Sequence, residues 1–280
     1  MIYVFGANGQ LGQSLKKVRP QNLEVKFLSS SDVDITNSNE LEPFFETIEK
    51  DDFIINCAAY TAVDKAESEK ERAFEVNAKA AQEIGKLCKK YNSNLIHIST
   101  DYVFSGEIET SRSENDLTSP INIYGQSKLD GEKRIVESNC NYTIIRTSWV
   151  FSEFGNNFFK TMKNLSDREG LNVVNDQIGS PTYAPDLAEV IFKVIKNYSK
   201  CSKELYHFSN KDQCSWHEFS KEIMNKLGSN TLVNPIPTSE YPTPAKRPAY
   251  SLLKTTKIEL DLSLEIRSWK EALEACIKEC

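Results

Sequence analysis

The sequence lacks any apolar run long enough to cross a bilayer. The longest apolar run near a predicted strand, Phe53 to Tyr60, is interrupted by Asn56, and a membrane helix needs about 20 residues. The chain starts directly with Met-Ile-Tyr-Val-Phe-Gly, without the basic and apolar leader that precedes a secretory cleavage site. We therefore expect a cytoplasmic protein with no membrane partner.

An excess of basic residues is also missing. Lysine and arginine number 34 against 40 aspartates and glutamates, a formal net charge of −6, whereas proteins that bind a phosphate backbone usually carry a basic stripe. We expect no nucleic-acid partner. The seven cysteines include no Cys-x-x-Cys and the three histidines are scattered, so we expect small buried thiols and no metal site.

What is present is the composition of an ordinary globular protein. The chain has 280 residues, 39% hydrophobic and 26% charged, with 11 glycines and 10 prolines, which excludes disordered, collagen-like and coiled-coil classes. Its length allows one large domain or two unequal lobes.

Short β-branched or aromatic runs alternate with helical patterns in the first half, which is typical of βαβ units and a parallel sheet. The predicted strands are Ile2–Phe5, Glu24–Leu28, Phe53–Asn56, Leu95–Ser99 and Thr143–Arg146. The predicted helices are Asn39–Lys50, Glu69–Tyr91, Gly125–Ser138, Asp186–Tyr198, His217–Leu227 and Ser268–Ile277. We predict an α/β fold: a Rossmann-like, doubly wound parallel sheet with a smaller C-terminal substrate-binding lobe.

The pattern changes after Trp149, where glycine- and proline-rich stretches interrupt the alternation. We therefore predict a dinucleotide-binding domain over residues 1–149, to which the chain returns around 184–198. Residues 150–280 are expected to form mainly the substrate-binding lobe.

Glycines follow the first strand and open a helix at Gly6, Gly9 and Gly12. In this context glycines let the backbone approach a pyrophosphate at the positive end of the helix. The spacing alone is a weak pattern, and a structural glycine turn remains the alternative.

The end of the second strand is where many dinucleotide folds place a carboxylate that binds the adenosine ribose. Here the residues are Ser29, Ser30 and Ser31, so a 2′-phosphate meets no repulsion there. We expect NADPH as the cofactor, with NADH also accepted. Asp34 and Ile35 follow and are candidates for the adenine side, with a solvated loop acid as the alternative.

Three residues point to carbonyl chemistry: Thr100, Tyr124 and Lys128. Tyr124 and Lys128 are four apart at the start of a predicted helix, so both side chains project from one face. A free tyrosine has a pKa near ~10, which a neighbouring ammonium lowers. Thr100 ends a predicted parallel strand, where such sheets place functional groups. A Tyr-x-x-x-Lys pair by itself is more often ordinary helix surface; the glycine turn and Thr100 reverse that reading.

With these motifs the sequence resembles the extended short-chain dehydrogenase/reductase family, and within it the dTDP-4-dehydrorhamnose reductases. The resemblance runs through the whole chain in order, over Gly6–Gly12, Asn56–Asp64, Ser99–Phe104, Pro120–Gly125, Arg146–Trp149, Gly155–Phe158, Asp176–Thr182 and Arg247–Pro248. Related nucleotide-sugar dehydratases typically carry an acidic residue after Thr-Asp, whereas this sequence has Tyr102. The resemblance therefore implies reduction of the 4-keto group of dTDP-4-dehydro-L-rhamnose rather than dehydration.

The resemblance also implies roles for individual residues. Tyr124 would donate a proton to the carbonyl oxygen, Lys128 would lower its pKa and hold the nicotinamide ribose, and Thr100 would hydrogen-bond near the reacting oxygen. The implied cofactor contacts are Gly6, Gly9, Gln10, Leu11, Gly12, Asp34, Ile35, Ala58, Ala59, Tyr60, Thr61, Tyr124 and Lys128. The implied substrate contacts are Val63, Thr100, Asp101, Tyr102, Trp149, Asn157 and Arg247, the last two toward thymidine diphosphate. Core packing for Trp149 and a surface ion pair for Arg247 remain alternatives.

Some members of the family carry a glutamate in the first helix that helps bind magnesium between two subunits. This sequence has Ser14 there, and a hydroxyl brings no formal charge to a hard divalent cation. We expect no magnesium bridge, and a monomer or weak metal-free homodimer. Two other functions stay open: a reductase of another 4-keto nucleotide sugar, and a non-catalytic regulatory subunit such as the one of methionine adenosyltransferase that shares this scaffold.

Overall fold

Six short strands form one parallel sheet, as the alternation of the sequence predicts. The structure, a computed structural model, describes residues 1–280. The strand order is β2-β1-β3-β4-β5-β10, and every neighbouring pair is parallel. The strands are β1 Ile2–Phe5, β2 Val25–Leu28, β3 Phe53–Asn56, β4 Asn94–Thr100, β5 Asn141–Thr147 and β10 Glu204–Phe208. Because β2 and β3 flank β1 on opposite sides, the winding reverses there, which is where such sheets bind ligands.

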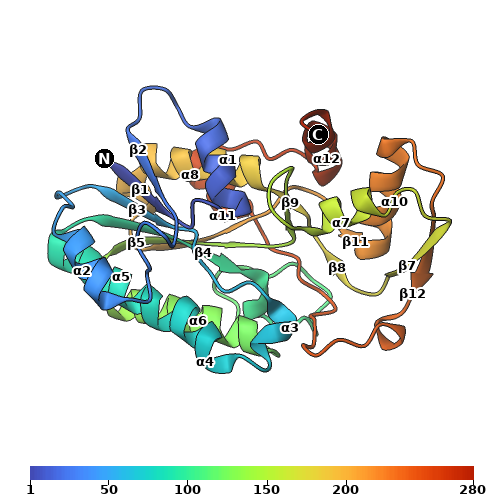
Figure 1. Cartoon of the computed structure of the whole chain (residues 1–280), viewed down its shortest axis with the longest axis horizontal. Helices are drawn as coiled ribbons and strands as arrows, with labels where there is room; N and C mark the ends of the chain where they lie inside the picture. The colour runs from blue at the N-terminus through green and yellow to red at the C-terminus, as the bar shows by residue number, and fades with distance from the viewer.

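Helices cover both faces of this sheet (Figure 1). The helices α1 (Gln10–Val18), α8 (Ala184–Lys196) and α11 (Thr256–Leu262) pack on one face, and α2 (Ser38–Phe45), α5 (Ala80–Tyr91) and α6 (Ile123–Glu137) on the other. The side chains of β1 alternate between the two cores: Ile2 and Val4 join one cluster, Tyr3 and Phe5 the other. A strand buried on both faces explains the continuous apolar run Ile-Tyr-Val-Phe, and the doubly wound fold is confirmed.

Two predicted helices differ in detail. The helix predicted from Asn39 ends at Phe45 instead of Lys50, because the carboxylate of Asp52 accepts hydrogen bonds from the N–H of Glu49 and from the N-terminal ammonium and folds this stretch into a turn. The helix predicted over Glu69–Tyr91 is broken into α4 (Lys70–Phe74), a π-helical turn over Glu75–Lys79, and α5. Such single π-turns are often found at functional sites.

The smaller lobe has its own core. Its strands are β6 Val150–Phe151, β7 Gly170–Val174, β8 Ile178–Gly179, β9 Thr182–Tyr183, β11 Cys214–Ser215 and β12 Leu232–Ile236, and its helices are α7 Phe158–Asn164, α10 Trp216–Leu227 and α12 Trp269–Lys278. Both α10 and α12 start with a capping box, Ser215 with Glu218 and Ser268 with Glu271, which satisfies backbone donors at the helix start. Phe219, Trp269 and Phe151 lie in the buried cluster between these elements.

The chain passes between the two lobes more than once. Besides α8, which packs on the main sheet, the strand β10 belongs to that sheet and the helix α11 packs on it. The sequence predicts a return of the chain to the sheet only around residues 184–198. The remaining short elements are α3 Val63–Ala66, η2 Asp101–Val103, α9 Tyr198–Cys201 and η3 Thr238–Glu240.

All seven cysteines are free thiols, and five of them are buried, as expected for small apolar residues. None of the helices combines the length and the apolar character that a bilayer crossing requires.

Candidate active site

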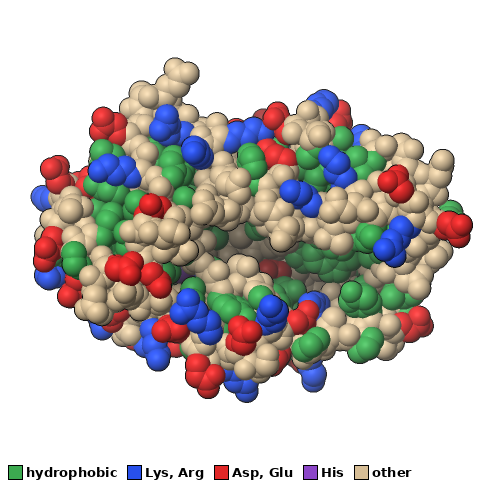
Figure 2. All heavy atoms as spheres, in the orientation of Figure 1, with side chains coloured by type: hydrophobic (Ala, Val, Ile, Leu, Met, Phe, Trp, Pro, Cys, Tyr) green, Lys and Arg blue, Asp and Glu red, His purple; other side chains and the backbone are tan.

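A cavity of about 580 Å³ opens at the carboxyl ends of β1, β3, β4 and β5. It is lined by Gly6, Asn8, Gly9, Gln10, Leu11, Gly12, Cys57, Ala59, Thr61, Ile98, Ser99, Thr100, Asp101, Tyr102, Tyr124, Lys128, Thr147, Trp149, Val150, Gly155, Asn156, Leu187 and Trp216. The space-filling view is hollowed between the larger and the smaller lobe (Figure 2). The cavity therefore brings most predicted cofactor and sugar contacts together.

The glycine turn forms one wall of this cavity. Gly6 has φ +81°, and a Cβ there would lie 2.7 Å from the backbone nitrogen of Ala58, so only glycine fits. A Cβ on Gly12 would lie 2.4 Å from the carbonyl oxygen of Gly6, so the helix α1 packs directly on the turn. The first backbone N–H groups of α1 have no partner within the helix and can bind an anion.

The side chain of Gln10 is committed elsewhere. Its Oε1 accepts hydrogen bonds from Asn157 Nδ2 at 2.8 Å and from Ser152 Oγ at 3.1 Å. Of the groups of Gln10, the backbone N–H therefore remains available for the predicted contact with a pyrophosphate. The same network uses the amide of Asn157, which also donates to the carbonyls of Ser152 and Phe154 and caps α7. Asn157 lines none of the cavities described here, so its predicted contact with the diphosphate finds no support in this geometry.

A second cavity, of about 360 Å³, continues from the glycine turn toward the second strand. It holds the predicted adenine-side residues Asp34 and Ile35 together with Ala58, Ala59 and Tyr60, and also Ser29, Ser30 and Arg72. The carboxylate of Asp34 accepts hydrogen bonds from the N–H and hydroxyl of Thr36, which hold its pKa below the usual range. Arg72 is a cation beside this cavity that the sequence did not indicate, because it comes from α4.

Thr100, Tyr124 and Lys128 all line the main cavity. Thr100 ends β4, and its hydroxyl oxygen accepts from the N–H of Tyr102 at 3.2 Å. Tyr124 and Lys128 lie in the first turns of α6, whose start is capped by the side chain of Asn122. The Thr100 hydroxyl itself donates to Asp101 Oδ1 at 2.9 Å, and all three predicted residues line the same cavity.

The pKa of Tyr124 departs from the expectation. Burial raises it to about 12, only partly opposed by the hydroxyl of Thr100, and Lys128 is not among the groups that lower it. The Nζ of Lys128 instead donates to the carbonyl of Ile98 at 2.6 Å and faces Nε2 of His97 at 3.4 Å. Burial lowers the pKa of Lys128 to about 8, partly opposed by Glu132. Tyr124 is thus fully protonated at neutral pH, the form needed to donate a proton.

Asn77, in the π-helical turn, holds the cofactor wall against the catalytic helix. Its Oδ1 accepts from the N–H of Tyr60 at 2.9 Å, and its Nδ2 donates to the carbonyl of Tyr60 at 3.1 Å and to Ser127 Oγ at 3.0 Å. Tyr60 belongs to the predicted wall along the dinucleotide, and Ser127 precedes Lys128. Asn77 therefore acts as a positioning residue.

Replacing Asn77 with alanine is expected to lower the free energy of unfolding by about 2–4 kcal/mol, because three buried hydrogen bonds lose a partner. It is also expected to weaken NADPH binding, because the Tyr60 wall is no longer fixed. Urea unfolding and fluorescence titration with NADPH measure the two effects. The control Asn164→Ala, at an exposed position in α7, should change neither; an Asn77→Ala variant with unaltered stability and NADPH affinity would contradict this role.

The sugar end of the cavity is bounded by aromatic rings. Trp149 stacks on Trp216, with ring centroids 3.5 Å apart and planes inclined by 6°, and both rings line the cavity. Tyr102 packs edge-on against Tyr124, with centroids 5.7 Å apart. Trp149 thus packs against another aromatic ring and also lines the cavity. Val63 lies at the start of α3 and lines none of the cavities described here, so its predicted sugar contact finds no support in this geometry.

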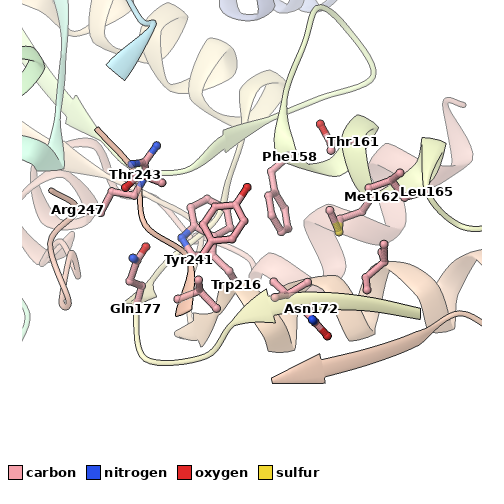
Figure 3. A pocket seen from close by; sticks show the side chains of 13 residues that line it. Phe158, Thr161, Met162, Leu165, Asn172, Gln177, Trp216, Tyr241, Thr243 and Arg247 are labelled. Carbon is pink, nitrogen blue, oxygen red and sulfur yellow. The ribbon is translucent and has the colours of Figure 1, made fainter. Parts of the chain in front are cut away.

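A further cavity of about 350 Å³ lies beyond Trp216 in the smaller lobe, lined by Phe158, Thr161, Met162, Leu165, Leu171, Asn172, Val173, Val174, Gln177, Trp216, Tyr241, Thr243 and Arg247. Figure 3 shows Arg247 and Gln177 on one side of it and Leu165 on the other. Arg247 forms a two-pronged ion pair with Asp64, at 2.9 and 2.7 Å, and the pair holds the pKa of Asp64 below its usual range. Arg247 is therefore both in an ion pair and at the cavity.

Sequence reasoning missed Trp216, Tyr241 and Phe158. Trp216 is the first residue of a helix with a capping box, and Tyr241 follows the 3-10 turn η3 in a proline-rich stretch. No spacing in the sequence connects them, because the two elements meet only through the fold of the smaller lobe.

The first helix does not fit a magnesium ion. Ser14 is fully buried, and its hydroxyl donates to the carbonyl of Gln10 at 2.8 Å. That hydroxyl is therefore engaged within the helix and is not exposed at the surface.

Comparison with known proteins gives consistent matches over the full length. The sequence matches the family described as RmlD substrate binding domain over residues 1–280. It is 39% identical to a dTDP-4-dehydrorhamnose reductase of Aggregatibacter actinomycetemcomitans, covering 98% of this chain and 97% of the relative. The fold superimposes with a TM-score of 0.94 on the dTDP-4-dehydrorhamnose reductase of Bacillus anthracis str. Ames in complex with NADP, at 39% identity over 100% of this chain and 99% of that one. A reductase of the same name from Clostridium acetobutylicum gives 0.94 at 40% identity, over 99% and 98%.

Proposed function

The chain belongs to the RmlD substrate binding domain family, and we propose that it is a reductase that uses NADPH to convert dTDP-4-dehydro-L-rhamnose into dTDP-L-rhamnose. The observation that carries this proposal is the gathering of Thr100, Tyr124 and Lys128 in the cavity that also holds the glycine turn. An intact set of this kind favours an enzyme over the regulatory-subunit alternative, as do full-length relatives named as reductases.

Tyr124 is the proton donor in this reaction. NADPH, when bound along the glycine turn and the Ala59–Thr61 wall, supplies the hydride. With its pKa raised to about 12 by burial, the Tyr124 hydroxyl is protonated and gives its hydrogen to the carbonyl oxygen as negative charge develops there. The hydroxyl of Thr100 is placed to hydrogen-bond the same substrate oxygen. The buried ammonium of Lys128 provides a positive charge in the first turns of α6.

The two cavities match the two ends of a nucleotide sugar. The sugar lies beside Tyr102, Asp101 and Trp149, and the apolar cavity beyond Trp216 accepts the base. Arg247 lines the apolar cavity, and its guanidinium suits phosphate oxygens. Because Asp64 already neutralises Arg247, the diphosphate competes with that carboxylate.

Oxidation of NADPH with enzymatically prepared dTDP-4-dehydro-L-rhamnose tests the proposal. We expect turnover at least tenfold faster, in kcat/KM, than with 4-keto sugar nucleotides that differ in sugar or base. Faster turnover of another 4-keto nucleotide sugar would move the assignment to that substrate, since small loop changes alter which sugar fits. Binding of NADPH without turnover of any of them would overturn it.

The preference between NADPH and NADH depends on the carboxylate of Asp32, which the sequence did not place near the end of the second strand. Asp32 folds back so that its carboxylate accepts from the N–H and the hydroxyl of Ser29, at 2.8 and 2.6 Å. Lys16, Ser29 and Asp32 line one surface cavity of about 440 Å³ next to the adenosine side.

The Asp32→Asn variant is expected to lower the KM for NADPH by about two- to fivefold, because an exposed charge that opposes the 2′-phosphate is removed while Lys16 remains. The KM for NADH should stay within twofold. Steady-state kinetics with both cofactors measure the ratio, with Glu107→Gln in an exposed loop as the control. An equal change for both cofactors would exclude Asp32 as the discriminating charge.

The assembly and location belong to the same proposal. We propose a monomer or a weak metal-free homodimer in the cytoplasm, with no nucleic-acid or membrane partner. The buried Ser14 and the net charge of −6 support this. Light scattering with and without magnesium tests it, and a magnesium-dependent dimer would contradict it.

A further inference from the structure

His97 is a buried histidine that the steps above do not use. It lies in β4, the strand that ends at Thr100, and is 1% exposed. Both of its ring nitrogens have a polar neighbour: Nδ1 lies 3.2 Å from Asn56 Nδ2, and Nε2 lies 3.4 Å from Lys128 Nζ. Burial and the charge of Lys128 hold the pKa of His97 well below its ordinary value. The ring is therefore neutral at pH 7 and carries one proton, on one of its two nitrogens.

The side-chain amide of Asn56 decides which nitrogen carries that proton. Asn56 ends β3, and its Oδ1 accepts a hydrogen bond from the backbone N–H of Ala58 at 3.1 Å. Its Nδ2, which can only donate, is therefore the atom that faces Nδ1 of His97. Because Nδ1 must accept this hydrogen bond, the ring proton belongs on Nε2.

The N–H at Nε2 points at an ammonium group that can itself only donate. The Nζ of Lys128 donates to the carbonyl of Ile98 at 2.6 Å, whereas its distance of 3.4 Å from His97 Nε2 is longer than an ordinary hydrogen bond. Two donors that face each other account for this longer distance. The neutral amine, in contrast, has a lone pair that can accept from Nε2.

The other titratable groups around Lys128 form no hydrogen bond with its Nζ. Next to β3, burial raises the pKa of the Cys57 thiol to about 12, so this thiol is neutral. In α6, both carboxylate oxygens of Glu132 accept from Arg146, and Tyr124 lines the same cavity as Lys128. The carbonyl of Ile98 is thus the one protein acceptor of the ammonium.

We propose that Asn56 and His97 are positioning residues for Lys128: they hold an N–H against its Nζ, so that the ammonium has one protein acceptor and keeps its other donors for a molecule in the cavity. This rests on the proposed function, in which that molecule is NADPH. An oxygen of the cofactor supplies the acceptor that His97 withholds. NADPH should therefore bind more tightly to the charged form of Lys128, and the free enzyme should lose this proton more easily than it would without His97.

Nitrogen-15 NMR of the protein labelled at histidine tests the tautomer. We expect the proton of His97 on Nε2 at pH 7, with its resonances assigned by their loss in His97→Phe. In Asn56→Asp a carboxylate oxygen replaces the amide nitrogen and can accept, so the proton should move to Nδ1. His207 is the internal reference for that second tautomer, because its Nδ1 lies 3.0 Å from the carbonyl of Arg112 and carries the proton.

The pH dependence of kcat/KM for NADPH tests the effect on Lys128. Burial lowers the pKa of Lys128 to about 8, so the wild-type value should fall as the pH rises through about 8. In Asn56→Asp, Nε2 of His97 becomes an acceptor for the ammonium, and this fall should move up by about 1 pH unit. His97→Phe keeps a ring but has no N–H, and the fall should move up by about 0.5–1 unit. Asn164→Asp, at an exposed position in α7, should leave the profile unchanged.

Three results overturn the proposal. They are a wild-type His97 with its proton on Nδ1, a pH profile that stays in place in both variants, or an upward shift in Asn56→Asp with the proton still on Nε2, which assigns the shift to the new charge alone. Melting curves establish that each variant is folded, and the wild-type tautomer needs no variant in which it must be preserved.

The outcome for the proposed function is read separately. The tautomer of His97 and the dissociation constant for NADPH, which should rise as the pH passes through about 8, are both measured without a sugar nucleotide. If these two results are as expected and wild type turns over no sugar nucleotide, the proposed function fails while the positioning role of His97 stands.

Discussion

Replacing Tyr124 with phenylalanine should lower kcat by about 10²–10⁴-fold, the usual contribution of a positioned general acid. The ring stays in its half-buried place beside Tyr102, and only the hydroxyl is lost. Because that hydroxyl donates its proton as charge develops on the substrate oxygen, the dissociation constant for NADPH should stay within about twofold of the wild-type value. Steady-state kinetics and fluorescence titration measure the two quantities on the same preparation.

Tyr91→Phe is the matched control for this variant. Tyr91 ends α5, away from the cavity, and its loss of a hydroxyl should leave kcat unchanged. A Tyr124→Phe enzyme whose kcat lies within tenfold of wild type would show that another group donates the proton.

Replacing Glu132 with glutamine should lower the free energy of unfolding by about 3–5 kcal/mol. Glu132 and Arg146 form a two-pronged pair at 2.9 and 2.7 Å, with side chains only 5% and 4% exposed. The glutamine leaves the arginine as a buried charge without its counter-ion, next to His207 and the ring of Phe104. Urea unfolding followed by circular dichroism measures the loss.

The Glu132→Gln substitution should also change the pKa of Lys128 in the active site. Glu132 lies one turn after Lys128 in α6 and raises its pKa, which burial otherwise lowers to about 8. Without Glu132, the pKa of Lys128 falls further, and activity that needs the ammonium should decline at a lower pH than in wild type. The double variant Glu132→Leu, Arg146→Met should recover much of the lost stability, because an apolar pair of similar volume replaces the ion pair. A single variant that loses less than about 1 kcal/mol would show that the pair is not a structural requirement.

The sheet was predictable because its signals are local. Each strand of the first half is a short run of β-branched or aromatic residues, and Gly6 and Gly12 mark a turn that no side chain fits. Thr100, Tyr124 and Lys128 were predictable for the same reason: the strand end and the four-residue spacing are visible in the chain itself.

The parts that depend on tertiary contacts were not predictable. The π-helical turn at Asn77 interrupts an otherwise regular helical pattern because its side chain bonds Tyr60 and Ser127, which lie far away in the sequence. The raised pKa of Tyr124 comes from burial, and Tyr124 packs with Ala66 and Ala73, which lie about 50 residues away in the sequence. Asn157 is hydrogen-bonded to Gln10 across the two lobes.

Transfer of a labelled hydride gives a direct test of the proposed reaction. NADPH carrying deuterium at its transferable position is mixed with dTDP-4-dehydro-L-rhamnose and the enzyme, and the product is examined by mass spectrometry and NMR. We expect one deuterium per product molecule, at C4 of the sugar, with the product identified as dTDP-L-rhamnose. Unlabelled product, deuterium at another carbon, or a different configuration at C4 would contradict it.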